Sequence, residues 1–135
     1  MLRDVFHKFY LRFQGVVLGE NVKIGKIRFK NGLRKTKIGN RVVIGNNVFI
    51  RDLGGVVIGD DCYIDDNVMF LSASHDPSDE AWRIFGKEIV VEDGVYIGWG
   101  AIILPGVTIS KGARIEPKSI VRKSVLSESV IVGEH

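Results

Sequence analysis

Residues 91–126 read VEDGVY-IGWGAI-ILPGVT-ISKGAR-IEPKSI-VRKSVL, six consecutive groups of six residues. Each group begins with an aliphatic residue, and these are Val91, Ile97, Ile103, Ile109, Ile115 and Val121. The fifth residue of each group is small or a short aliphatic: Val95, Ala101, Val107, Ala113, Ser119 and Val125. An α-helix has an apolar period of about 3.6 residues and a flat strand one of about 2, so a period of six fits neither. Short strands that alternate with corners do fit it, and the stretch therefore predicts a parallel β-helix.

The repeat has a direct physical explanation. The aliphatic first residue points into the coil, and the fifth residue faces inward close to a corner, where space is tight. Corners need a positive φ or a tight turn, which Gly, Asn and Asp tolerate best. Successive coils pair backbone to backbone about 4.8 Å apart, so their inward side chains form one continuous core.

Upstream of residue 91 the period continues with two interruptions. The repeats begin near Leu18, become indistinct at 30–37, and lengthen to eight residues between Ile50 and Ile58, where we expect Gly54 and Gly55 to form a bulge. We predict an all-β domain of about five coils over residues 16–126. The final residues, 127–135, fit the pattern poorly and are expected to form a C-terminal tail.

Residues 1–15 are expected to form an amphipathic helix. Apolar residues recur at helical spacing, with basic residues on the other face: Leu2, Val5, Phe6, Phe9, Tyr10 and Phe13. One interpretation is a cap that covers the open end of the β-helix. The alternative is a helix, residues 1–14, that contacts a membrane surface, because it combines aromatic residues with Lys and Arg.

Composition limits the classes of function. The 135 residues are 45% hydrophobic and 26% charged, typical of one domain with an appendage. A single cysteine, Cys62, excludes an intrachain disulfide, occupies an inward fifth position, and is compatible with a cytoplasmic location. The net charge of +3 favours an anionic ligand, but basic residues do not alternate with aromatic ones in a stripe, so we expect no nucleic-acid partner.

The period fails between His75 and Glu88, in HDPSDEAWRIFGKE. We predict a loop over residues 75–88 that leaves the coil. Its Trp82, Ile84 and Phe85 are apolar and are expected to pack on the wall of the same chain or on a partner subunit.

The run IVVEDGVYIGWGAIILPGVTI (89–109), preceded by SHD (74–76) and the insertion, resembles the hexapeptide-repeat acyltransferases. The resemblance covers roughly residues 16–125 and is strongest to sugar and exopolysaccharide O-acetyltransferases of the colanic-acid, galactoside and maltose types. It implies a left-handed β-helix, a homotrimer with active sites between neighbouring prisms, acetyl-CoA as the acyl donor, and direct transfer with a histidine as general base.

His75 is the candidate general base. Of the three histidines, His7 lies in the expected helix and His135 is terminal, whereas His75 stands between the regular wall and the insertion. An alcohol is a poor nucleophile until its proton is removed. Neutral imidazole, with an ordinary pKa of about 6.5, can accept that proton. Asp76 is a doubtful partner because adjacent side chains of an extended segment point in opposite directions. A carboxylate on a neighbouring coil or a backbone carbonyl is expected to fix the tautomer.

Counting coils places Arg51 and Asp52 one coil below Leu71 and Ser72. The pair is a candidate for acceptor binding or, equally, a solvated corner. Further acceptor-binding candidates are Asp65, Asn67 and Asp76.

The donor site rests on the resemblance. It implies that the pantetheine arm follows the coil edges at Gly98, Trp99, Gly100, Ala101, Pro117 and Lys118. It also implies that phosphate groups meet Arg122 and Lys123, which can form charge-assisted hydrogen bonds with them. Trp99 and the Glu116-Pro117-Lys118 stretch depart from the family pattern and leave open an altered or lost donor.

Three classes of function follow. The first is acetyl transfer from acetyl-CoA to a hydroxyl of a sugar or glycan precursor, at the inner face of a membrane if the helix binds lipid; N-acetylation of an amino sugar cannot be separated from it. The second is a non-catalytic trimeric scaffold. The third, a zinc enzyme of the same fold, needs three histidine ligands, and the repeats contain one histidine, so we expect no metal.

Overall fold

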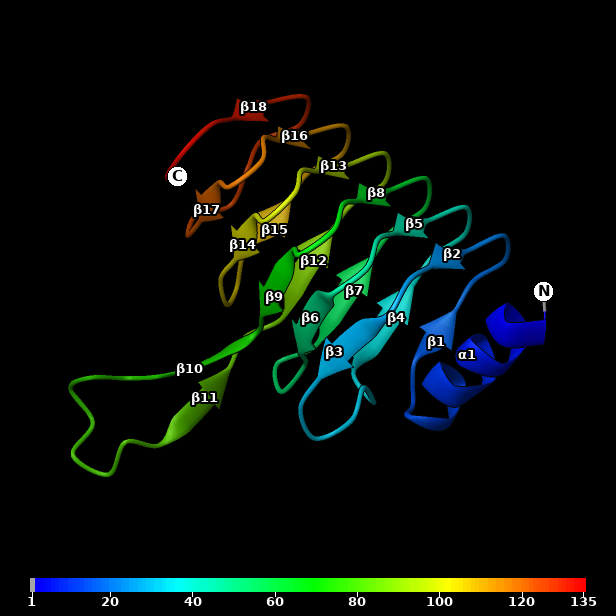
Figure 1. Cartoon of the computed structure of the whole chain (residues 1–135). Helices are drawn as coiled ribbons and strands as arrows, with labels where there is room; N and C mark the ends of the chain where they lie inside the picture. Colours follow the sequence, from blue (N-terminus) through cyan, green and yellow to red (C-terminus); the bar gives the residue numbers. More distant parts are fainter. Residues whose placement is uncertain (1) are drawn as a thin grey trace.

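Three parallel sheets wind around one core in the computed structural model, which describes residues 2–135 (Figure 1). The β1 sheet has the order β1-β4-β7-β12-β15, the β2 sheet β18-β16-β13-β8-β5-β2, and the β3 sheet β17-β14-β9-β6-β3. Strands follow one another from sheet to sheet, so three strands make one turn and the six-stranded sheet marks six turns. The chain is therefore the predicted parallel β-helix.

The element bounds are α1 (Leu2–Phe13), β1 (Val17–Leu18), β2 (Lys23–Ile24), β3 (Ile27–Phe29), β4 (Thr36–Ile38), β5 (Val43–Ile44), β6 (Val48–Arg51), β7 (Val56–Ile58), β8 (Tyr63–Ile64), β9 (Met69–Leu71), β10 (Ala73–His75), β11 (Ile84–Gly86), β12 (Ile89–Val91), β13 (Tyr96–Ile97), β14 (Ile102–Ile103), β15 (Thr108–Ile109), β16 (Arg114–Ile115), β17 (Ile120–Val121) and β18 (Val130–Ile131).

The hexad positions behave as predicted. Every first and fifth residue of 91–126 is buried, none with more than 1% of its surface exposed. Cys62 is buried as well, and burial raises the pKa of its thiol, which makes it a poor nucleophile. Its place in the core is the one that the sequence predicted.

The corners adopt the backbone that the sequence requires. Positive φ values occur at Asn47, Asn67 and Lys118 of successive turns, and at Gly100 between them. Polar side chains also bridge turns: the Asn40 and Asp60 Oδ1 atoms each accept a backbone N–H from the turn below, at 2.8 Å. Such bonds satisfy corner donors that have no strand partner.

The structure has six turns rather than about five, because the C-terminal residues are not a tail. Val125 bridges to Ile109, and β18 pairs with β16. Four residues lead from Val121 in the β3 sheet to Val125, which joins the β1 sheet, whereas six residues lead from Ile103 to Ile109 in the turn below. This shortened corner shifts the register, which explains why residues 127–135 do not fit the hexad pattern.

The bulge predicted between Ile50 and Ile58 is present. Gly55 has a φ of 96°, and its N–H donates to the Asp52 carbonyl at 2.8 Å. The turn takes up the two extra residues, and the β6–β9 and β4–β7 pairings keep their register.

Helix α1 lies at the N-terminal end of the prism (Figure 1). Met1, which belongs to the predicted helix, lies outside the described residues. Leu11 is buried in the core, as a cap requires, but Phe6, Phe9 and Phe13 are exposed, so the cap interpretation is wrong for the aromatic face. Leu33, whose N–H binds the Gln14 carbonyl, is buried in the same core and closes its end together with Leu11. Within residues 2–135, no helix has the length and apolar character to cross a membrane.

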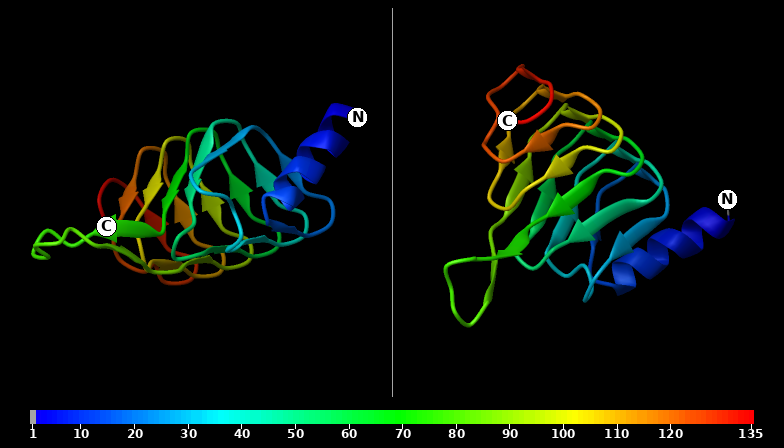
Figure 2. Two further views of the ribbon diagram at one scale, coloured as in Figure 1. Left: turned by 90° about the horizontal axis from the view of Figure 1, so that it is seen from below. Right: turned by 60° about the vertical axis from the view of Figure 1, so that its left-hand side comes forward.

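The predicted loop at 75–88 is a β-hairpin that begins two residues earlier. Strands β10 and β11 pair antiparallel, with Ala73 opposite Gly86 and His75 opposite Ile84. The hairpin projects well beyond the wall of the prism (Figure 2).

Two corners of the prism carry all the predicted site residues. We call the corner between the β3 and β1 sheets the hairpin corner; it comprises residues 30–35, 51–55, 71–88, 104–107 and 122–124. We call the corner between the β2 and β3 sheets the Trp99 corner; it comprises residues 25–26, 45–47, 65–68, 98–101 and 116–119. The β3 sheet lies between them.

Candidate functional site

His75 ends β10 and is exposed at the base of the hairpin. Its Nδ1 atom lies 2.5 Å from the carbonyl oxygen of Trp82. A carbonyl can only accept, so Nδ1 carries the proton, and in the neutral ring Nε2 keeps its lone pair. The Trp82 ring stands edge-on to the imidazole, with 6.2 Å between the ring centroids. The hairpin thus orients an imidazole whose Nε2 can accept a proton.

Asp76 is occupied within its own turn. Its Oδ1 accepts the backbone N–H of Ser78 at 2.9 Å and the Ser78 hydroxyl at 2.6 Å. The hydroxyl and then the backbone N–H hold the pKa of this carboxyl below its ordinary value. A backbone carbonyl rather than this carboxylate fixes the tautomer of His75.

A cavity of about 600 Å³ opens beside the hairpin. Ile84 and Phe85 contribute apolar surface, and the polar lining comes from His75, Asp76, Asp79, Arg83 and Lys87. Arg83 is paired with Asp79, with 2.8 Å between Nε and Oδ2. Arg83 and Lys87 were not predicted as site residues from the sequence. Their position in the one long insertion was the signal that could have identified them.

Arg51 and Asp52 lie where coil counting placed them. Arg51 lies opposite Leu71 in the β6–β9 strand pairing, and the Ser72 N–H donates to the Arg51 carbonyl at 3.0 Å. Both residues line a smaller cavity of about 160 Å³ that shares Ile84 with the hairpin cavity. They are therefore neighbours of the hairpin in space.

Asp52 has a second, structural set of contacts. It is 7% exposed, and its Oδ2 accepts the Lys35 N–H at 2.9 Å and the Thr36 hydroxyl at 3.1 Å. Asp52 therefore holds the chain where it enters β4, while Arg51 alongside is half-buried.

We expect Asp52→Ala to lower the free energy of unfolding by about 1–3 kcal/mol, because it leaves the buried Thr36 hydroxyl and the partly buried Lys35 N–H without an acceptor. Urea denaturation measures this loss. The matched control is Glu20→Ala at an exposed corner, which should change stability by no more than about 0.5 kcal/mol. Equal stability of the two variants would show that the Asp52 contacts contribute nothing.

Arg122 and Lys123 lie on the hairpin corner two turns above His75. At about 4.8 Å per turn, this places them about 10 Å along the prism from the imidazole. Both are exposed, and Arg122 lies 3.6 Å from Glu134. Arg51 and Asp52 lie one turn to the other side of His75, so the corner has cationic groups on both sides of the candidate base.

The other predicted donor residues stack on the Trp99 corner. The Lys118 Nζ lies 4.6 Å from the centroid of the Trp99 ring, and the Lys118 N–H donates to the Trp99 carbonyl at 2.8 Å. A Cβ on Gly98 would lie 2.6 Å from the Pro117 nitrogen, so this close stacking needs glycine. Glu116, an unexpected negative charge, is paired with Arg114 at 2.7 Å. The departures from the family pattern thus pack against one another.

Asp65 and Asn67 lie on the Trp99 corner too. Asp65 Oδ1 accepts the Asp66 N–H at 2.7 Å, and Asn67 Oδ1 accepts from the Asn47 side-chain amide at 2.5 Å. Within one chain, the structure places His75 on the same corner as Arg51, Asp52, Asp76, Arg122 and Lys123. It does not bring together His75 and Asp65, Asn67, Gly98, Trp99, Gly100, Ala101, Pro117 or Lys118.

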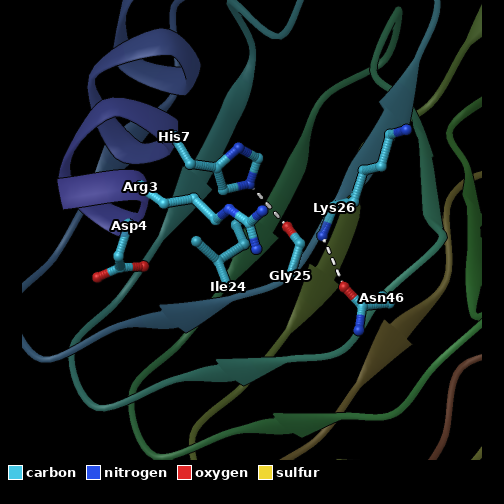
Figure 3. A pocket seen from close by; sticks show the side chains of 7 residues that line it. All are labelled: Arg3, Asp4, His7, Ile24, Gly25, Lys26 and Asn46. Atoms are coloured by element: carbon cyan, nitrogen blue, oxygen red, sulfur yellow. Dashed lines mark hydrogen bonds between the residues drawn. The ribbon is translucent and has the colours of Figure 1, made fainter. Parts of the chain in front are cut away.

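Another cavity, of about 540 Å³, lies between α1 and the first two turns (Figure 3). Its histidine, His7, holds the Gly25 carbonyl oxygen with Nε2 at 2.7 Å. A carbonyl only accepts, so Nε2 carries the proton in this contact. The hydrogen bond attaches α1 to the prism. No predicted catalytic or donor residue lines this cavity.

Comparison with known proteins agrees with the fold. A family model described as the hexapeptide repeat of succinyl-transferase matches residues 35–69 and 88–116. The putative colanic acid biosynthesis acetyltransferase WcaF of Escherichia coli is 29% identical over 128 residues, which cover 93% of this chain and 69% of that protein. The chain spans about half to two thirds of the length of several curated relatives that it matches, from 47% to 69%.

Solved structures extend the likeness. A hexapeptide-repeat acetyltransferase of Vibrio cholerae in complex with acetyl-CoA is 27% identical, with a TM-score of 0.86 over 93% of this chain and 70% of that one. A galactoside acetyltransferase in complex with CoA is 25% identical, with a TM-score of 0.80 over 94% and 74%. In its repeats and in its fold, the chain is similar to the hexapeptide-repeat acetyltransferases.

Proposed function

We propose that this protein transfers an acetyl group from acetyl-CoA to a hydroxyl of a sugar or glycan precursor, with His75 as general base. The observation that carries the proposal is the contact between His75 Nδ1 and the Trp82 carbonyl, which leaves Nε2 free to accept a proton. The exposed imidazole stands beside a cavity large enough for part of a substrate.

The chemistry needs one proton acceptor. Nε2 of His75 takes the proton of the acceptor hydroxyl as its oxygen bonds to the acetyl carbonyl carbon. The thioester C–S bond then breaks, the electron pair stays on sulfur, and the proton passes from the imidazolium to that sulfur. The products are an acetyl ester and the CoA thiol, and His75 is neutral again.

The donor assignment is supported by charge and by the relatives. Arg122 and Lys123 give the hairpin corner two exposed cations about two turns, or about 10 Å, beyond His75. Cationic donors bind phosphate groups by charge-assisted hydrogen bonds. The Vibrio cholerae relative binds acetyl-CoA and the galactoside acetyltransferase binds CoA.

A homotrimer would unite the two corners. The Trp99 corner lies across the β3 sheet from His75 in one chain, so the pantetheine-binding residues there need the hairpin of a neighbour. The hairpin has the apolar surface for such a contact, since Trp82, Ile84 and Phe85 are between 37% and 60% exposed. We propose that each site lies between the hairpin corner of one subunit and the Trp99 corner of the next.

We propose sugars as acceptors because one of the similar structures is that of an acetyltransferase named for galactosides, which are sugar derivatives. The test is to incubate the protein with acetyl-CoA and a panel of mono- and oligosaccharides, and to identify acetylated products by mass spectrometry. Acetyl esters, which mild alkali removes, would support O-transfer. If only amino sugars gave products and these were stable to alkali, N-acetylation would replace O-acetylation. The absence of any acetylated sugar would contradict sugars as the acceptors.

A further inference from the structure

The apolar face of α1 points away from the protein. Leu2, Val5, Phe6, Phe9 and Phe13 are between 62% and 80% exposed. At 100° per residue these five side chains share one side of the helix, and Leu11, the one buried residue of α1, lies on the opposite side. A contiguous apolar surface of this kind on a folded protein marks a contact with a partner or a membrane.

The orientation of this face is fixed by contacts on the other side of the helix. His7 binds the Gly25 carbonyl oxygen of the first turn at 2.7 Å (Figure 3). Leu11 packs into the core and its carbonyl accepts the Val16 N–H. The helix therefore cannot roll its aromatic residues onto the prism without losing these contacts.

The same end of the molecule is strongly basic. Residues 1–37 contain ten Lys and Arg against two Asp and Glu, a net charge of +8, whereas residues 38–135 contain nine against fourteen, a net charge of −5. Nine of the ten cations are exposed: Arg3, Arg12, Lys23, Lys26, Arg28, Lys30, Arg34, Lys35 and Lys37. These residues form α1, the first turn and the start of the second, so the prism has a cationic end and an anionic body.

We propose that α1 and the first turn dock the protein on an anionic lipid bilayer. Phe6, Phe9 and Phe13 enter the boundary between headgroups and acyl chains, and the surrounding cations meet the headgroup phosphates. Charge complementarity selects this occupant, because a second copy docked by the same face would bring one +8 end against another. The proposal is independent of the acetyl-transfer chemistry.

Flotation of the full chain with vesicles tests the proposal. We expect binding to mixed phosphatidylcholine–phosphatidylglycerol vesicles, weaker binding to pure phosphatidylcholine, and release at high salt. The double variant Phe9→Ser, Phe13→Ser should bind the mixed vesicles more than about tenfold more weakly. The control Leu126→Ser, Val132→Ser alters residues that are 79% and 73% exposed in the C-terminal turns and should bind like the wild type.

A charge variant tests the electrostatic part separately. Arg28→Glu with Lys30→Glu should weaken binding to the mixed vesicles by at least about tenfold, since each headgroup-facing cation contributes about fivefold. The matched single change Lys111→Glu, distant from the basic end, should have little effect. Wild-type binding to neither vesicle, or unchanged binding of the Phe9, Phe13 variant, would overturn the proposal. A lower sedimentation mass of that variant would also overturn it, by showing that a second copy covers the face.

Discussion

Replacing His75 by alanine should reduce acetyl transfer by about 10²–10⁴-fold, the usual contribution of a positioned general base. The variant removes the only imidazole of the hairpin, whose Nδ1–H donates to the Trp82 carbonyl. In the proposed mechanism, Nε2 of this imidazole accepts the proton of the acceptor hydroxyl. Because His75 is exposed, the β-helix should remain folded. Single-turnover transfer to a sugar identified as an acceptor, with circular dichroism as the folding check, measures both effects.

The matched control is His7→Ala, which removes an imidazole from α1 and should leave the transfer rate unchanged. A second signature separates catalysis from structure. The wild-type rate should fall on acidification, because a protonated imidazole has no lone pair at Nε2, and the residual rate of the alanine variant should lack this acid limb. A His75→Ala enzyme with the wild-type rate and pH profile would remove the assignment.

The largest expected loss of stability comes from Phe70→Ala, at about 3–5 kcal/mol of unfolding free energy. Phe70 is fully buried in β9, between Ile50 of β6 and Ile103 of β14 in the neighbouring turns. Truncation opens a cavity that paired strands on both sides cannot collapse to fill. Strand β9 leads directly into β10, so transfer activity should fall together with stability.

Denaturant unfolding with an unchanged m-value measures this loss. The control is Phe9→Ala, which removes an identical side chain that is 69% exposed on α1 and should change stability by no more than about 0.5 kcal/mol. A Phe70→Ala protein as stable as the control would mean that the core of the third turn is not packed as described.

Much of the fold could be predicted because each turn repeats one physical problem. The inward first and fifth hexad positions, the corner residues and the bulge at Gly54 and Gly55 all follow from spacing alone. The sixth turn could not be predicted, since the corner after Val121 is two residues shorter and Val125 moves into register with Ile109. The sequence left open whether the aromatic face of α1 covers the core or faces outward, because the residue that closes the core with Leu11, Leu33, lies in a stretch with no clear period.

The candidate site was only partly predictable. His75 stood out by residue type and by its place at the edge of the insertion. Its partner, the Trp82 carbonyl, depends on the register of the β10–β11 hairpin, which sequence did not define. The hexad spacing does imply that Gly98 to Ala101 and Arg122 lie on different corners, because Gly98 and Arg122 are four hexads apart and three hexads make one turn.

The most direct test of the account is calorimetric titration of the protein with acetyl-CoA, which needs no knowledge of the acceptor. We expect saturable binding that Arg122→Ala with Lys123→Ala weakens by more than about tenfold, since hydrogen bonds to charged groups contribute about 1.5–3 kcal/mol each. The exposed Lys111→Ala should bind like the wild type. Absence of binding by the wild-type protein would contradict acetyl-CoA as the donor.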